Sequence, residues 1–226
     1  MPIARNWDKK FFDAWSPEMA YVLGFMFADG YVYKNSSGGW YLCICSTDLE
    51  LVKAIRNVWQ SEHKIGVKLP SLKFHRLRSL YTVQIGSKVV CERLASFGVV
   101  QNKSLTVVFP KVPVAFLGCF VRGYFDGDGC VSFKRYWRKD REQWKYQLTV
   151  RFTSGSRDFL EGLWRSLSVC TVEGGHINKK QRGYELVFSQ HDSFALYDLM
   201  YDNIPSRLFL KRKFRVFIRA ARVLRS

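Results

Sequence analysis

The apolar positions of this chain gather in two runs that each end in Asp-Gly, "YVLGFMFADG" at residues 21–30 and "FVRGYFDGDG" at residues 120–129. Both runs have the pattern of a buried helix. After each Asp-Gly, apolar and polar residues alternate with a period of two, as in a half-buried strand. The pattern therefore predicts a helix followed by strands, and it predicts this twice.

The second run repeats the first at an offset of 128 − 29 = 99 residues, and the rest of the chain follows the same offset. Each half continues with two strands, an amphipathic helix, two more strands and a closing helix. We therefore predict an α+β chain of two pseudo-symmetric αββαββα halves, 17–109 and 110–226, after an N-terminal extension of residues 1–16. The second half adds a basic amphipathic helix, "LKRKFRVFIRAARVLRS".

Both predicted motif helices carry a stripe of small residues, which lets two backbones approach closely. If the stripes face each other, the helices cross as a near-symmetric pair. At the first helix, Ser16 and Pro17 suit an N-cap and first-turn proline, and Gly30 suits a left-handed C-cap. The stripes consist of Ala20, Gly24 and Ala28 in the first helix, and Cys119, Gly123 and Gly127 in the second.

This crossing would bring Asp29 and Asp128 side by side at two helix C-termini, where helix dipoles disfavour negative charge. A divalent cation such as Mg²⁺, which prefers carboxylate and backbone oxygens, would stabilise them. The alternative is that each Asp-Gly is an ordinary turn and each small residue ordinary packing. Two copies in register favour the metal site.

The net charge of the chain indicates what kind of partner it binds. The 226-residue chain has 36 Lys and Arg against 19 Asp and Glu, a formal net charge of +17. Such an excess indicates a polyanionic partner, more often nucleic acid than an anionic membrane. The six cysteines show no metal-ligand spacing, which favours reduced thiols. We see neither a signal peptide nor a membrane-spanning run and expect a soluble protein of the cytoplasm or an organellar matrix.

The two motif copies resemble those of single-chain LAGLIDADG homing endonucleases, and the resemblance covers nearly the whole chain. It implies that the motif helices join the two halves, and that each half lays a four-stranded antiparallel sheet on duplex DNA to form a saddle. It also implies that Asp29 and Asp128 bind the metal. The sixth motif position differs between the copies, Phe27 against Asp126, and that position varies in the family. We favour Asp126 as a helix-terminal group or one beside the metal ligands over a third ligand.

The resemblance implies further catalytic residues. A lysine near the metal at the start of each half's last helix corresponds to Lys103 and to Lys213, with Lys211 as the fallback. Cations there would stabilise the negative charge that builds up during phosphodiester cleavage. Ser46 and Ser154 end the second strand of each half, where family members position site waters. The alternatives are solvated surface lysines and serines that cap helices.

Strand alternation predicts the DNA-reading residues, because positions two, four and six after each aspartate share a face. The segment "KRYWRKDREQWK" (134–145) adds basic residues suited to phosphates, although charged loops are often only solvated. Polar side chains in so basic a chain suit base and phosphate contacts. The predicted reading residues are Tyr31, Tyr33, Asn35, Tyr41 and Cys43 in the first half, and Cys130, Ser132, Lys134, Arg138, Lys139, Lys145, Gln147, Thr149 and Arg151 in the second.

The resemblance thus implies a monomeric, site-specific double-strand DNA endonuclease of the homing type. It would depend on Mg²⁺, with Mn²⁺ as a substitute, and leave 3′ overhangs. Because the predicted reading residues differ between the halves, the target should be non-palindromic and roughly 20 bp long. Two alternatives stay open: an RNA-splicing maturase on the same scaffold, and a DNA-binding protein without catalysis.

Overall fold

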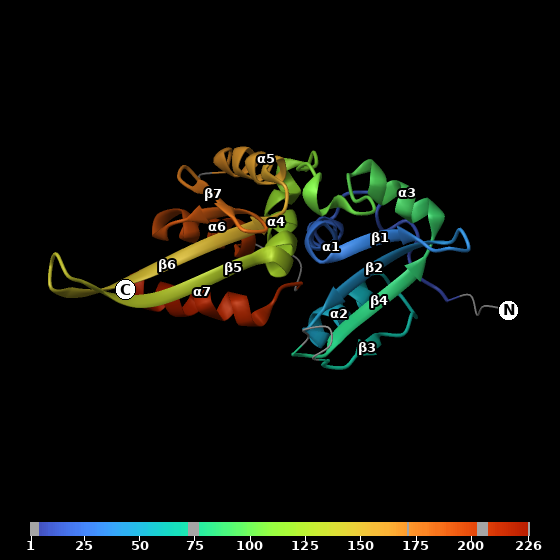
Figure 1. The fold of residues 1–226 in the computed structure, drawn as a ribbon, viewed down its shortest axis with the longest axis horizontal. Helices are drawn as coiled ribbons and strands as arrows, with labels where there is room; N and C mark the ends of the chain where they lie inside the picture. The colour runs from blue at the N-terminus through green and yellow to red at the C-terminus, as the bar shows by residue number, and fades with distance from the viewer. Residues whose placement is uncertain (1–4, 72–76, 171, 203–207, 226) are drawn as a thin grey trace. The chain divides into compact units, whose positions relative to one another are not determined.

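The computed structural model describes residues 5–71, 77–170, 172–202 and 208–225 (Figure 1). The first repeat contains α1 (Pro17–Ala28), β1 (Gly30–Lys34), β2 (Trp40–Ser46), α2 (Leu49–Val58), β3 (Gly66–Lys68), β4 (Leu80–Gly86) and α3 (Lys88–Ser96), followed by a 3₁₀ turn (Lys103–Leu105). The second contains α4 (Val114–Asp128), β5 (Gly129–Arg138), β6 (Gln143–Ser154), α5 (Arg157–Ser168), β7 (His176–Lys180), β8 (Gly183–Phe188), α6 (Gln190–Tyr201) and α7 (Lys211–Leu224).

Each repeat forms one four-stranded antiparallel sheet, with strand orders β1-β2-β4-β3 and β5-β6-β8-β7. The two orders are the same once the second is renumbered. The predicted α+β class and the repeated αββαββα order are confirmed. None of the described helices is long and apolar enough to cross a membrane.

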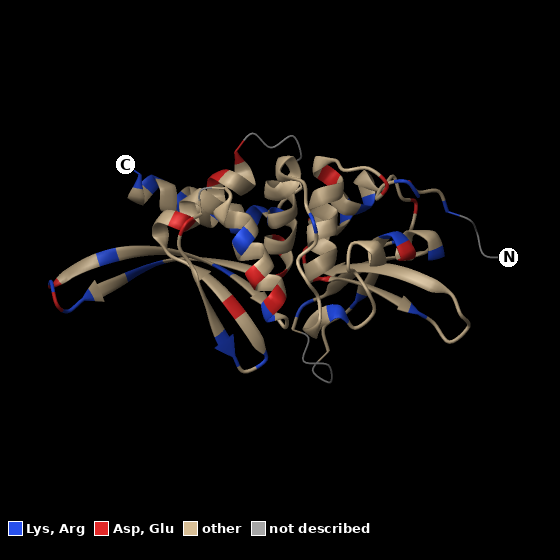
Figure 2. Cartoon of the chain, turned by 90° about the horizontal axis from the view of Figure 1, so that it is seen from above, with Lys and Arg blue, Asp and Glu red and all other residues tan. Residues whose placement is uncertain are grey.

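Within each sheet, alternate side chains point to a face covered by helices. Leu42 and Ile44 of β2 are fully buried on that face in the first sheet, as are Val150 and Phe152 of β6 in the second. In each unit the helices gather on one side of the sheet and leave the other side open (Figure 2). We call these two sides the helix face and the open face.

The chain divides into two compact units, and α4 belongs to the first unit although it opens the second repeat. The first unit comprises residues 1–103, 110–127 and 205–208, and the second comprises 104–109, 128–204 and 209–226. The N-terminal segment also packs on the first unit, because Phe12 is buried and makes an edge contact with Trp59.

The two small-residue stripes meet inside the first unit. A side chain on Gly24 would overlap the backbone carbonyl of Phe120, and one on Gly123 would overlap that of Tyr21. Nine consecutive residues of α1, Met19–Phe27, are buried, so helix α1 is covered on all sides. The predicted helix crossing therefore exists, and it needs glycine at its closest points.

The first motif helix begins as expected but ends differently. The Ser16 hydroxyl accepts the Met19 N–H at 3.0 Å, and Pro17 occupies the first turn. The prediction that Gly30 is a left-handed cap was wrong, because Asp29 caps the helix with φ −97° and Gly30 is absent from the described residues with positive φ. Gly30 begins β1, and a Cβ there would lie 2.5 Å from the Met26 Cα. Close packing explains this glycine.

Candidate functional site

The ends of the two motif helices approach each other in the first unit. The Asp29 N–H donates to the Phe25 carbonyl at 2.9 Å, which fixes Asp29 as the C-cap of α1. A Cβ on Gly127 of α4 would lie 3.5 Å from the Asp29 carboxyl carbon. Asp128 follows Gly127 as the last residue of α4 and, like Asp29, is half-buried. Glycine at 127 thus leaves room beside the first motif aspartate.

A buried lysine is fixed in the same way in each repeat. The Lys103 ammonium donates to the Gly30 carbonyl, and the Lys213 ammonium donates to the Gly129 carbonyl, both at 2.6 Å. Each lysine is 6% exposed, and each acceptor directly follows a motif aspartate. The fallback residue Lys211 is exposed instead.

This geometry is difficult to explain by the alternative of solvated lysines. Burying an ammonium is unfavourable unless hydrogen bonds and nearby negative groups compensate it. The Lys103–Gly30 bond spans 73 residues and the Lys213–Gly129 bond spans 84. Each repeat therefore holds a positive charge at the residue after its motif aspartate.

Ser46 and Ser154 lie at equivalent strand ends and are both buried. The Ser46 hydroxyl accepts the Asp48 N–H, and the Ser154 hydroxyl accepts the Ser156 N–H, each at 3.1 Å. Asp48 and Ser156 in turn cap α2 and α5. The two serines thus stabilise the strand-to-helix turns, and a role in positioning water stays a prediction.

Asp126 points into the helix crossing and is 2% exposed. The Tyr21 hydroxyl donates to its carboxylate at 2.7 Å. The guanidinium of Arg122, which is fully buried, lies 5.5 Å from the centre of the Tyr21 ring. Asp126, at the sixth motif position, thus belongs to a buried cluster of polar side chains between the two helices. The sequence did not identify Tyr21 and Arg122 as members of this cluster.

Cys45 is a neighbour of Asp29 that the sequence analysis also missed. Its thiol contacts the Asp29 carbonyl at 3.3 Å. Burial, and to a smaller extent the negative charge of Asp29, raises the pKa of Cys45 to about 11. At neutral pH this thiol is therefore protonated. Alternation along β2 from Tyr41 was the available signal, because Cys45 is the next residue on that face after Cys43.

The open face of the first sheet has the predicted parity. Tyr31 pairs with Cys43, and Tyr33 pairs with Tyr41, in the β1–β2 ladder. The rings of Tyr33 and Tyr41 stack with centroids 5.3 Å apart. Cys43 is only 1% exposed, so it offers little surface to a ligand. The Asn35 side chain accepts the Gly39 N–H at 2.6 Å and so closes the hairpin turn.

The open face of the second sheet is richer in polar groups. Its register places three pairs of predicted residues opposite each other, Cys130–Arg151, Ser132–Thr149 and Lys134–Gln147, and places Lys145 opposite Tyr136, which was not predicted. Thr149 is only 7% exposed. At the hairpin tip, Arg138 donates to Asp140 at 3.0 Å, and this hydrogen bond lowers the pKa of the aspartate. Lys139 is exposed beside it.

The inner strands add open-face residues that we did not predict. Gln84 of β4 lies opposite Cys43. In the second sheet, Glu185 of β8 lies 3.1 Å from the Lys180 ammonium and 4.0 Å from the Arg151 guanidinium. The same alternation along "LYTVQIGS" and "GYELVFSQ" would have indicated these positions, but we applied it only to the first two strands of each half.

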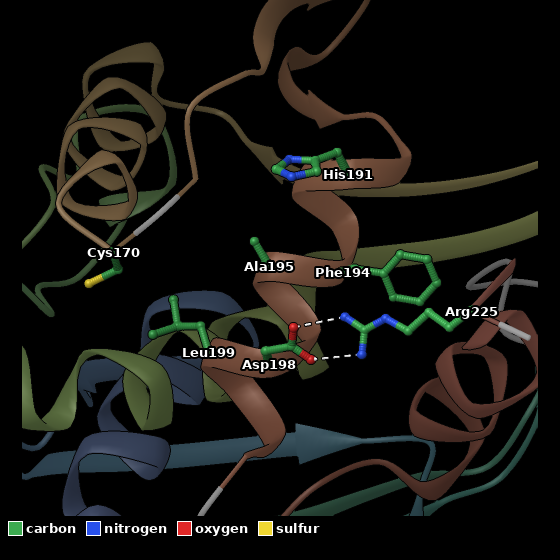
Figure 3. A pocket seen from close by; sticks show the side chains of 7 residues that line it. All are labelled: Cys170, His191, Phe194, Ala195, Asp198, Leu199 and Arg225. Atoms are coloured by element: carbon green, nitrogen blue, oxygen red, sulfur yellow. Dashed lines mark hydrogen bonds and ion pairs between the residues drawn. The ribbon is translucent and has the colours of Figure 1, made fainter. Parts of the chain in front are cut away.

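The second unit also has a pocket of about 490 Å³ away from these groups. It lies beside α6, and Arg225 closes one side through paired hydrogen bonds to Asp198 at 2.8 and 3.3 Å (Figure 3). Cys170 and His191 both line it but point to different parts of the pocket (Figure 3). They do not form a nucleophile–base pair, and we assign this pocket no chemistry.

Comparison with known proteins identifies the fold. Residues 115–195 match the family model of the LAGLIDADG-like domain. The I-SmaMI LAGLIDADG homing endonuclease bound to cleaved DNA aligns with 94% of this chain and 90% of its own, at 14% identity and a TM-score of 0.57. The chain has the LAGLIDADG homing endonuclease fold.

Two further structures share the LAGLIDADG fold. I-SmaMI bound to uncleaved DNA in the presence of calcium ions covers 93% of this chain and 90% of its own, at 12% identity and a TM-score of 0.57. The I-LtrWI homing endonuclease bound to target DNA covers 92% and 91%, at 11% identity and a TM-score of 0.54. The suspected resemblance is thus confirmed at the level of the fold.

Two curated proteins of Methanocaldococcus jannaschii are similar in sequence. Reverse gyrase is 26% identical over 169 residues, which are 75% of this chain and 9% of that protein. An uncharacterized protein is 33% identical over 122 residues, which are 52% of this chain and 40% of that protein. The chain therefore spans less than half the length of either relative.

Proposed function

We propose that this protein is a Mg²⁺-dependent, site-specific double-strand DNA endonuclease. One repeated observation carries the proposal. In each half, the ammonium of a buried lysine donates a hydrogen bond to the carbonyl of the residue that follows the motif aspartate. Two such pairs of aspartate and lysine suit the cleavage of two strands, because each supplies a metal-binding carboxylate and a cation for one scissile phosphate. Binding DNA without cleaving it would not require two buried ammonium groups, each bonded to the carbonyl of the residue after a motif aspartate.

The residues fit a hard divalent cation. Asp29 and Asp128 supply carboxylate oxygens, and Gly127 leaves space beside the Asp29 carboxylate. Among the described residues, no cluster of three or more His, Cys, Asp or Glu could hold a metal. Two carboxylates suit Mg²⁺, which keeps several waters and binds through one or two carboxylates and substrate phosphates. When bound, Mg²⁺ supplies a Lewis acid for the scissile phosphate and activates water as the nucleophile.

The lysines supply the remaining charge. As water attacks phosphorus, negative charge develops on the phosphate oxygens, and a fixed cation stabilises it without reorganisation. The Gly30 and Gly129 carbonyls hold the ammonium groups of Lys103 and Lys213 in place. We propose that each strand is cut once and that the two cuts are staggered, which leaves short 3′ overhangs.

We further propose that the two open faces read a target of roughly 20 bp, one helical turn for each sheet. The first face carries stacked tyrosines and the second carries Lys134, Lys145, Gln147 and Arg151. Different reading groups favour a non-palindromic site. Since both aspartates belong to one chain, a single copy should suffice, and a footprint with sedimentation tests this directly. Two chains on one duplex, or a palindromic consensus, would contradict it.

The first experiment is selection of cleaved sequences from a randomised duplex library with Mg²⁺. On the selected site, Asp29→Asn and Asp128→Asn should each abolish cleavage of both strands and leave DNA affinity within about tenfold. Asp158→Asn, an exposed change of equal charge on α5, is the control and should cut normally. Ca²⁺ should support binding without cutting.

The outcomes separate the alternatives. Robust cleavage by either aspartate variant would refute a metal site that needs both Asp29 and Asp128. Sequence-specific binding without cleavage by the wild type, with Mg²⁺ or Mn²⁺, would indicate a DNA-binding protein. Splicing of a host intron without DNA cleavage would indicate a maturase.

A further inference from the structure

Helix α7 has no counterpart of similar length in the first repeat, where Lys103 opens only a 3₁₀ turn. One side of α7 packs into the second unit. Phe217 and Ala220 are fully buried, and Phe214 lies 5.1 Å from the Tyr201 ring of α6. The buried side of α7 holds the helix in the second unit, and Lys213 connects the helix to the residue after Asp128. Neither feature explains the rest of the helix surface.

Another side of α7 lines a hollow of about 580 Å³. Its floor is apolar and consists of Phe209, Phe214 and Ile218, which are half-buried. Its rim is basic, and none of the described residues that line it is acidic. The rim residues, all exposed, are Lys211, Arg215, Arg219 and Arg222.

The apolar surface continues from this hollow onto the β5–β6 hairpin. The Arg219 guanidinium lies 5.7 Å from the Phe133 ring, and Phe133 stacks on Tyr146 at 5.3 Å. Farther along, Arg135 lies 4.3 Å from the Trp144 ring. Trp144 is 53% exposed and Tyr146 is 40% exposed. Exposed apolar side chains that gather beside a hollow are typical of an interaction site.

This patch lies on the helix face of the second sheet. Strand alternation puts Phe133, Arg135, Trp144 and Tyr146 on one side of the hairpin and Lys134, Lys145 and Gln147 on the other. A ligand on the open face therefore leaves the patch uncovered. We define the α7 surface as the hollow together with these four hairpin residues.

We propose that the α7 surface docks an acidic amphipathic helix of a partner protein. Apolar side chains spaced by three and four residues would fill the hollow along α7, and carboxylates on the flanks would face the rim arginines. The four basic rim residues give the charge complementarity that selects an acidic partner.

A single-stranded nucleic acid fits this surface less well. Bases bind to exposed aromatic faces. In the hollow, Phe209 and Phe214 contact each other at 5.2 Å and Phe209 also contacts Tyr201, so the rings form a fixed floor. Ile218 has no ring, and Arg135 already covers one face of Trp144. The hollow suits inserted aliphatic and aromatic side chains better than stacked bases.

The probe is a fluorescent helical peptide of roughly 18 residues with leucine and phenylalanine on one face and glutamate on the other. A shuffled peptide of the same composition has no apolar face. The test variant is Arg215→Glu with Arg222→Glu. The matched control is Arg157→Glu with Arg165→Glu, two exposed arginines on α5 that change the net charge equally. Thermal unfolding shows whether the two charge reversals unfold the protein. If they do, Arg215→Gln with Arg222→Gln is the test variant instead.

We expect the helical peptide to bind the wild type and to bind the α7 variant about tenfold more weakly, with the α5 control unchanged. The shuffled peptide should also bind about tenfold more weakly. Prior addition of the target duplex should not displace the helical peptide. Equal loss in both variants, or equal binding of the shuffled peptide, would show attraction by net charge alone and overturn the proposal. Displacement by the duplex, or by single-stranded RNA with the same sensitivity to the α7 variant, would make this a nucleic-acid surface instead.

Discussion

Gly127 offers a direct test of the helix crossing, because the residue that it faces is itself small. A methyl group added at Gly127 would overlap the methyl group of Ala28. The two carbon atoms would lie less than 3.0 Å apart, a separation that protein structures essentially never contain. Its next neighbours, the Asp29 nitrogen and carboxyl carbon, lie at 3.4 and 3.5 Å, which is ordinary contact. Gly127→Ala therefore meets one obstacle, and Ala28→Gly removes it.

The magnitudes follow from this geometry. Overpacking in a closely packed region costs about 1–3 kcal/mol. Replacing glycine with alanine stabilises a helix interior by up to about 1 kcal/mol, and the last turn by less. Gly127→Ala should thus lower the free energy of unfolding by about 1–2 kcal/mol. Ala28→Gly alone should lower it by about 1 kcal/mol, through propensity and a lost contact.

The double variant should be close to the wild type, because it moves one methyl group from α1 to α4. The coupling between the two changes should then be about 2 kcal/mol, within the range known for residues in contact. Equilibrium urea unfolding of the four proteins measures it. Tryptophan fluorescence is a suitable probe, since Trp15 stacks on Phe116 of α4 at 6.0 Å.

Two results would refute the reasoning. If Gly127→Ala stabilises the protein, helix propensity dominates and the two helices do not touch at this end. If the effects of the single changes add within about 0.5 kcal/mol, the two methyl groups do not meet. Both measurements are independent of nuclease activity, so they test the crossing and not the proposed function.

Three further predictions concern the site. Lys103→Met and Lys213→Met should each slow cleavage of the selected target by about 10²–10³ while binding persists, since each removes a fixed cation; unchanged single-turnover rates would contradict this. The affinity for DNA should fall steeply with salt, and Lys139→Ala at the exposed hairpin tip should reduce the slope of log K against log salt by about 0.9 without changing sequence preference; a changed preference would show that Lys139 reads a base. Alkylation of Cys45, followed by mass spectrometry, should accelerate with pH up to about 11, because only the thiolate reacts and burial raises its pKa; a rate that levels off below pH 9 would contradict the burial.

The sequence by itself determined the repeated architecture, because helix and strand periods and the helix cap are local properties. The 99-residue offset, the cap at Ser16 and Pro17, and the parity that places Tyr31 with Cys43 all appear in the structure. The small-residue stripes even indicated that the motif helices cross. Asp29 and Asp128 were found because two copies of one pattern end in the same residue.

The tertiary structure alone decided which distant groups meet. The Lys103–Gly30 and Lys213–Gly129 hydrogen bonds and the Tyr21–Asp126 hydrogen bond each join residues more than 70 positions apart, and no local period encodes such a distance. Gly30 shows the same limit. A glycine after a helix serves equally well for positive φ or for close packing, and only the position of Met26 selects the second. The hollow beside α7 likewise depends on how Phe209 and Phe214 pack against Tyr201, because an amphipathic pattern predicts that a face is buried but not which part of the helix stays open.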